Sequence, residues 1–153
     1  MSESIFTWKD EYEVGHDDMD ATHKEFVSCV DALLGAADDE LAVRLEAFAE
    51  HARRHFAEED DAMRHGAYNA GGCHIDEHAA VLRSLDQVRE ALREGRFAVV
   101  RSFAEALADW FPEHARVMDL GLARWMVQER LGGAPVLIQR RNAPTVHQAI
   151  GVQ

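Results

Sequence analysis

The chain has 153 residues, enough for one domain with a continuous hydrophobic core. It is 47% hydrophobic and 29% charged, a balance typical of soluble globular proteins. The formal net charge of −12 argues against nucleic acids and anionic membranes as partners. No stretch approaches the roughly 18 apolar residues of a membrane span, and no signal peptide is visible at the N-terminus. We therefore expect a cytoplasmic protein that binds neither membranes nor nucleic acid.

Hydrophobic periodicity predicts four long helices separated by short breaks. Asp38 and Asp39 are plausible caps for the second helix. A glycine-rich loop follows that helix, and Gly95 is a natural stop for the third. Pro112 lies inside the fourth helix and should kink it just before His114. The expected helices cover about residues 18–36, 40–64, 73–93 and 97–131.

The short connections favour antiparallel neighbours, so we predict an all-α, up-down-up-down four-helix bundle over residues 1–131. Its first 17 residues form an N-terminal arm, in which Trp8, Tyr12 and Val14 should cover the bundle. Residues 132–153 contain two prolines and no helical stripe, so they form a C-terminal tail. That tail is either loosely packed or places Pro135–Ile138 on an apolar patch or a dimer contact.

Each predicted helix carries histidine, and two helices add a carboxylate. The pairs His55/Glu59 and His74/His78 are four residues apart, so both members share one helix face. His114 and Asp119 are five apart, which turns Asp119 away on a regular helix and suits a carboxylate that bridges two ions. A lone histidine on an apolar stripe is more often a hydrogen-bonded core residue. Here all four helices carry such residues, and burying so many polar groups without partners would be very costly. The predicted metal ligands are His23, His55, Glu59, His74, His78, His114 and Asp119.

The donor types and their number narrow the choice of metal. Seven ligands are too many for one ion, and the number does not suit zinc, which prefers four ligands. Calcium and magnesium take oxygen ligands, whereas imidazole with carboxylate suits iron, manganese or copper. Two ions with about six positions each offer about twelve. The histidines, two bridging carboxylates and a solvent-derived bridge leave one position open, and dioxygen fits it. Cys29 and Cys73 should stay reduced, and the Cys73 side chain points about 100° away from His74.

Four sequence runs resemble the haemerythrins, in particular the single-domain bacteriohaemerythrins. The resemblance covers roughly residues 6–130, and all seven ligand positions are filled. The matching runs are Val14–Lys24, His55–Met63, His74–His78 and Trp110–Asp119.

The resemblance implies a pair of iron ions joined by an oxo or hydroxo bridge. One iron would be held by His74, His78 and His114, and the other by His23 and His55. Glu59 and Asp119 would bridge the two, and the second iron would keep the open position. The implied function is reversible dioxygen binding for transport, storage, delivery or sensing, which is not enzymatic. The alternatives are a di-iron redox enzyme that handles peroxide or nitric oxide, and an iron store or sensor. No protein partner is indicated.

Several residues beside the ligands have open roles. Phe56, Trp110 and Phe111 are expected to wall the ligand pocket, although ordinary core packing explains them equally well. Ala115 is smaller than the branched residue expected after a ligand, which would loosen that pocket. The remaining histidines match no family role: His51 is a candidate partner of His55, His16 has no assigned role, and His65 and His147 are expected in solvent.

Overall fold

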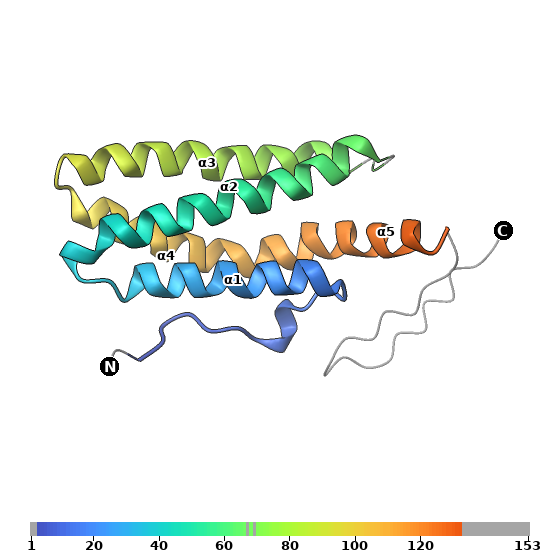
Figure 1. The fold of residues 1–153 in the computed structure, drawn as a ribbon, viewed down its shortest axis with the longest axis horizontal. Helices are drawn as coiled ribbons and strands as arrows, with labels where there is room; N and C mark the ends of the chain where they lie inside the picture. The colour runs from blue at the N-terminus through green and yellow to red at the C-terminus, as the bar shows by residue number, and fades with distance from the viewer. Residues whose placement is uncertain (1–2, 67, 69, 133–153) are drawn as a thin grey trace.

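The computed structural model describes residues 3–66, 68 and 70–132, and all regular structure within them is helical. The helices lie side by side as a four-helix bundle, and α4 and α5 follow one another along a single rod (Figure 1). This confirms the predicted fold class. The α-helices are α1 (Asp17–Leu34), α2 (Leu41–His65), α3 (Gly71–Arg93), α4 (Phe97–His114) and α5 (Leu120–Arg130), and a π-helical segment (Ala115–Asp119) joins the last two.

Two helix starts differ in detail from the expectation. Asp38–Glu40 form a 3-10 turn, in which the Glu40 carboxylate accepts the Ala37 N–H at 2.9 Å. The capping carboxylate before α2 is therefore that of Glu40. Helix α3 begins at Gly71, inside the expected loop. A Cβ at Gly71 would lie 3.2 Å from the Met63 Cβ, so glycine lets α3 begin close against α2.

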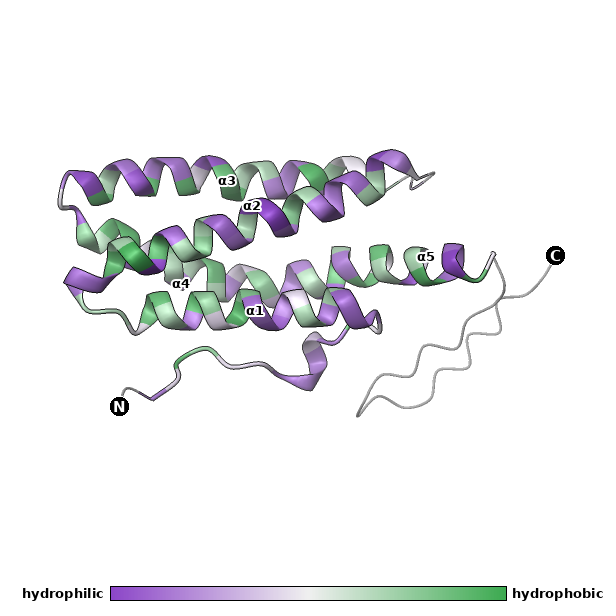
Figure 2. Ribbon diagram, viewed as in Figure 1, coloured by the Kyte–Doolittle hydropathy of each residue, from purple (hydrophilic) through white to green (hydrophobic). Residues whose placement is uncertain are grey.

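The core lies along the bundle axis, where apolar faces of all four rods meet. Hydrophobic and hydrophilic residues alternate along each helix in Figure 2, as helical periodicity requires. Aromatic rings run through this core towards the middle of the bundle. The rings of Phe26 and Phe111 stack with centroids 5.0 Å apart and planes inclined by 22°. The fully buried aliphatic side chains around them include Leu33, Leu41, Leu45 and Leu85.

The N-terminal arm packs along the bundle beside α1 (Figure 1). Phe6 and Tyr12 are buried against Phe111, with ring centroids 6.2 and 5.5 Å away. Two aspartates of α1 hold the arm by its backbone. Asp31 accepts the N–H groups of Ile5 and Phe6 at 2.7 and 2.8 Å, and Asp20 accepts those of Val14 and Gly15 at 2.8 and 3.2 Å. The arm is thus the apolar cover that the sequence predicts.

None of the helices described is long and apolar enough to cross a lipid bilayer. The expected C-terminal tail lies outside the described residues except for Gly132, as does His147.

Candidate metal centre

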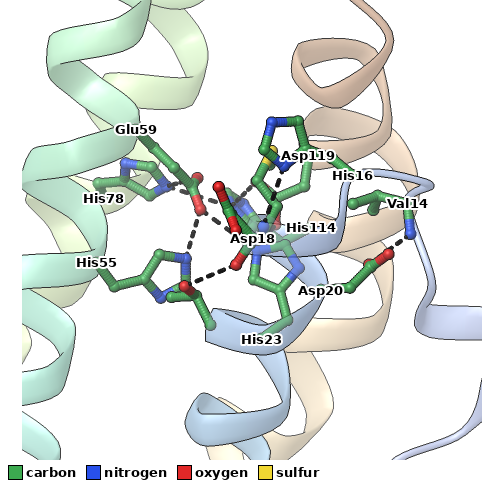
Figure 3. Close-up of polar contacts among 12 residues, drawn as sticks. Val14, His16, Asp18, Asp20, His23, His55, Glu59, His78, His114 and Asp119 are labelled. Carbon is green, nitrogen blue, oxygen red and sulfur yellow. Dashed lines mark hydrogen bonds and ion pairs between the residues drawn. The ribbon is translucent and has the colours of Figure 1, made fainter. Parts of the chain in front are cut away.

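The side chains of all seven predicted ligands meet inside the bundle, towards the end at which α1 and α3 begin, and every one of them is buried. Figure 3 labels all of them except His74. They form two groups that share Glu59. In each group, one possible ligand atom from every member lies within 4.8 Å of the others. The larger group is Glu59, His74, His78, His114 and Asp119, and the smaller is His23, His55 and Glu59.

In the larger group, three imidazole Nε2 atoms face carboxylate oxygens. Asp119 Oδ1 lies 2.9 Å from His74 Nε2 and 3.2 Å from His114 Nε2. Glu59 Oε1 lies 3.4 Å from His74 Nε2 and 3.5 Å from His78 Nε2. The three imidazoles and one oxygen of each carboxylate thus surround a common point.

In the smaller group, the imidazoles face the second oxygen of Glu59 and of Asp119. Glu59 Oε2 contacts His55 Nε2 and lies 3.3 Å from His23 Nε2. Asp119 Oδ2 also lies 3.3 Å from His23 Nε2. Each carboxylate therefore divides its two oxygens between the groups, as a carboxylate that bridges two ions must do.

The π-helical segment accounts for the position of Asp119. The Leu120 N–H donates to the Ala115 carbonyl, a bond between residues five apart. A turn closed in this way contains one more residue than an α-helical turn, so Asp119 comes back under His114. The segment follows Pro112, which has no N–H to donate to an α-helical bond. The sequence predicts a kink just before His114, but α4 stays α-helical up to that residue and the departure from α-helical bonding comes just after it.

Two carboxylates that are not among the predicted ligands contact ligand histidines at Nδ1, the ring nitrogen that faces away from the centre. Asp60 Oδ1 lies 2.7 Å from His78 Nδ1, and Glu77 Oε1 lies 3.0 Å from His114 Nδ1. An ionised carboxylate can only accept, so both imidazoles carry their proton on Nδ1. The two Nε2 atoms then point towards the centre, where they lie 3.3 Å apart. In neutral imidazoles these atoms offer the lone pairs that a metal ion binds.

Buried polar atoms at the centre also fit a metal. Three inward-facing atoms have no hydrogen-bond partner among the described residues: Glu59 Oε1, His74 Nε2 and Asp119 Oδ1. Leaving each one unpaired costs about 1–3 kcal/mol. Coordination to a cation would remove that cost, and a shell of imidazole and carboxylate without sulfur suits iron, manganese or copper.

The pKa values show which of these groups carry charge before a metal binds. Burial raises the pKa of Glu59, but the charge of His55 and the close contacts with His23, His55 and His74 outweigh it, so the net pKa lies well below the usual value. Burial likewise lowers the pKa of His74, but Asp119 and Glu59 together raise it to about 9. Burial lowers the pKa of His78 to about 4, despite Glu59 and Asp60 nearby. Burial lowers the pKa of His23 as well, but Asp119 and Glu59 together raise it above its usual value. The centre thus offers an ionised carboxylate at Glu59, a neutral imidazole at His78, and a proton on His74 that a metal ion must displace.

The aromatic residues expected to wall a pocket pack against the ligands. The Phe56 ring stacks on His78 at a centroid distance of 4.1 Å, and the Trp110 ring stacks on His114 at 4.1 Å. Phe111 meets His23 edge-on at 5.6 Å, and Ala115 is buried directly after His114.

A pocket of about 210 Å³ reaches the smaller group from the side of the bundle. Two predicted ligands, His55 and Glu59, line it, and its outer wall carries the acidic residues Asp18 and Glu58. Sequence reasoning did not identify this opening, because its walls come from three different helices. The other lining residues are His16, Met19, Thr22 and Met126.

The histidines without a predicted role are also placed. His16 caps α1, where its Nδ1 accepts the Met19 N–H at 3.2 Å and its Nε2 lies 3.0 Å from the Arg130 guanidinium. His51 is buried, with its ring centroid 5.3 Å from that of His55 and its Nδ1 3.5 Å from Glu25. His65 and Cys73 are exposed.

Comparison with known proteins gives one family and one curated relative. Residues 14–126 match the sequence profile described as "Hemerythrin HHE cation binding domain". The chain is also 31% identical over 124 residues to a protein of Ralstonia nicotianae named "Bacteriohemerythrin". That alignment covers 81% of this chain and 90% of the relative. No solved structure matches the chain.

Proposed function

Because this chain belongs to the haemerythrin family, we propose that it binds two iron ions and takes up dioxygen reversibly. One ion would be held by His74, His78 and His114, and the other by His23 and His55. Glu59 and Asp119 would join them, together with an oxo or hydroxo bridge. The proposal rests chiefly on Glu59 and Asp119, each of which places one oxygen at either group of histidines. A site for a single metal ion would not require that arrangement.

The ligand count favours one open position on the ion held by His23 and His55. When bound, the iron pair would supply two electrons and a coordination position for dioxygen. The chain would hold the ions apart from bulk water. Phe111 lies edge-on to His23, and the N-terminal arm covers Phe111 through Phe6 and Tyr12.

The pocket beside His55 and Glu59 supports a second candidate function. Its volume of about 210 Å³ is several times the roughly 30 Å³ of one water molecule. Its walls carry histidine, carboxylate, threonine and methionine side chains. A small polar molecule such as hydrogen peroxide would therefore fit beside His55 and Glu59. Di-iron redox catalysis on a small polar substrate is the alternative that this pocket favours.

The proposal is tested by reducing the iron-loaded protein without air and then admitting oxygen. We expect two irons per chain and a visible absorption change that vanishes under vacuum and returns with oxygen over repeated cycles. Rapid, irreversible conversion to the oxidised protein would contradict reversible binding. Hydrogen peroxide should then be added with an electron donor, and fast turnover would favour the redox enzyme.

A further inference from the structure

The two groups of ligands differ in how firmly their imidazoles are held. In the larger group, His78 and His114 each use the ring nitrogen opposite the centre to contact a carboxylate. Asp60 comes from α2 and holds a histidine of α3, whereas Glu77 comes from α3 and holds a histidine of α4. These contacts fix which ring nitrogen is bare and where it points.

Aromatic rings hold the same two histidines on their faces. Phe56 lies almost parallel to His78, with an interplanar angle of 7°, and Trp110 lies at 27° to His114. The Trp110 N–H donates to Glu77 Oε1 at 3.0 Å, the same oxygen that faces His114. The carboxylate, the indole and the imidazole thus fix one another in a single arrangement.

In the described part of the chain, the histidines of the smaller group have neither a carboxylate at Nδ1 nor an aromatic ring stacked on the imidazole face. Among the described residues, the buried Nδ1 atoms of His23 and His55 have no hydrogen-bond partner, and in the larger group the same is true of His74 alone. The nearest aromatic contacts of these rings are tilted or edge-on, with Phe56 at 45° to His55 and Phe111 at 77° to His23. The smaller group also faces the pocket through His55, whereas none of the three histidines of the larger group lines it.

From this asymmetry we propose that Asp60 and Glu77 are positioning residues that make the His74/His78/His114 position the tighter of the two. That position fills first, and the ion at His23 and His55 binds more weakly and exchanges through the pocket. The inference rests on the two-metal part of the proposed function and is independent of dioxygen. Losing a partner that orients a ligand typically weakens metal affinity by about 10–100-fold.

The test is a titration of the metal-free protein with Co²⁺, followed by calorimetry and by visible absorption. The wild-type protein should take up two ions in two resolved steps. His114→Ala should abolish the tighter step, and His23→Ala the weaker one. Asp60→Ala and Glu77→Ala should each weaken the tighter step by roughly 10–100-fold. Asp60→Asn, which keeps an acceptor oxygen, should restore part of the loss.

Matched controls separate positioning from a general loss of structure. Asp61→Ala and Asp76→Ala remove the neighbouring exposed carboxylates and should leave both steps unchanged. Circular dichroism of each metal-free variant checks the fold. A second readout is proton NMR of the cobalt-loaded protein, in which coordinated imidazoles give shifted ring N–H signals. Those of His78 and His114 should exchange slowly with D₂O, and the former should exchange faster in Asp60→Asn.

The outcomes are distinct. Two steps of equal affinity, or an Asp60→Ala titration that matches Asp61→Ala, would overturn the inference and leave the di-iron function standing. Uptake of only one ion by the wild-type protein would contradict the proposed function itself.

Discussion

At His74 a metal ion must compete with a proton. The carboxylates of Asp119 and Glu59 outweigh the effect of burial and raise the pKa of this imidazole to about 9, so it is protonated at neutral pH in the metal-free protein. Metal binding should therefore release a proton. Calorimetry in buffers of different ionisation enthalpy measures that release at pH 7. Equal apparent enthalpies in all buffers would contradict it.

The same shift predicts how the stability of the metal-free protein depends on pH. The raised pKa of His74 contributes stability below pH 6.5, which is lost as the pH rises through about 9. The pKa values of His51 and His78 are lowered to about 4, so these two histidines affect the stability at acidic pH, below 6.5. They remain neutral when folded but gain protons when unfolded, so stability falls as the pH drops from 6.5 towards 4. Urea unfolding should show a maximum near pH 6.5 and a loss on the order of 3 kcal/mol by pH 9. A stability that rises steadily across this range would contradict the assignment.

Removing single ligands should affect the metal more than the fold. His74→Ala takes away one imidazole of the three-histidine position and should lower the iron content below two per chain. Glu59→Ala removes a side chain that contacts both groups, so the pair should be lost while the helices remain. Iron analysis with circular dichroism measures both effects. Unchanged iron content in both variants would sink the ligand assignment.

Among the elements, the join of α4 to α5 is where local sequence patterns are least informative. The five-residue spacing of His114 and Asp119 is visible in the sequence, and it marks Asp119 as turned away on a regular helix. Only the π-helical segment explains how Asp119 Oδ1 comes within 3.2 Å of His114 Nε2. No residue type specifies such a turn, so the sequence alone predicts the ligand without its geometry.

Asp60 and Glu77 were missed for a related reason. Each adjoins a ligand, Glu59 or His78, and on a helix the next residue points about 100° away. That direction leads to a neighbouring helix, where the partner is a histidine in a different part of the sequence. Helical spacing reveals pairs on one face of one helix, but contacts between helices depend on the packing of the bundle.

The pocket formed by α1, α2 and α5 should control access to the smaller group. Thr22 is a half-buried residue of α1 that lines it together with His55. Thr22→Trp should fill the pocket and slow azide binding to the oxidised, iron-loaded protein by roughly tenfold, equivalent to about 1.4 kcal/mol in the barrier. Stopped-flow absorption measures the rate.

Ser28→Trp supplies the control for this substitution. Ser28 lies on the same helix but lines a different surface groove, so azide should bind at the wild-type rate. Equal rates for Thr22→Trp and Ser28→Trp would show that ligands take another route.

At the scale of the whole molecule, the helices and the ligand set follow from one cause. The apolar stripes predict four rods with buried faces, and the histidines lie on those same faces. Packing the rods therefore brings the ligands together. The N-terminal arm is also predictable, because its apolar residues need a surface to cover. The capping role of His16 could not be predicted, because its second contact, Arg130, lies at the C-terminal end of α5.

A centre shared by all the rods should link metal binding to the stability of the fold. Removing the metal leaves the neighbouring carboxylates of Glu59 and Asp119 and several unpaired polar atoms inside the bundle. Metal at about 1,000 times its dissociation constant should add about 4 kcal/mol to the free energy of unfolding. The melting temperature should then fall by roughly 10 °C after chelation. Scanning calorimetry of the loaded and the chelated protein tests this, and identical melting temperatures would contradict a metal at the centre.

The most direct test is anomalous X-ray diffraction at the iron edge from a crystal of the iron-loaded protein. Two iron peaks should appear, roughly 3.5–4 Å apart. One should lie against His74, His78 and His114 and the other against His23 and His55, with Glu59 and Asp119 reaching both. A single iron peak, or peaks away from these side chains, would contradict the proposed di-iron centre.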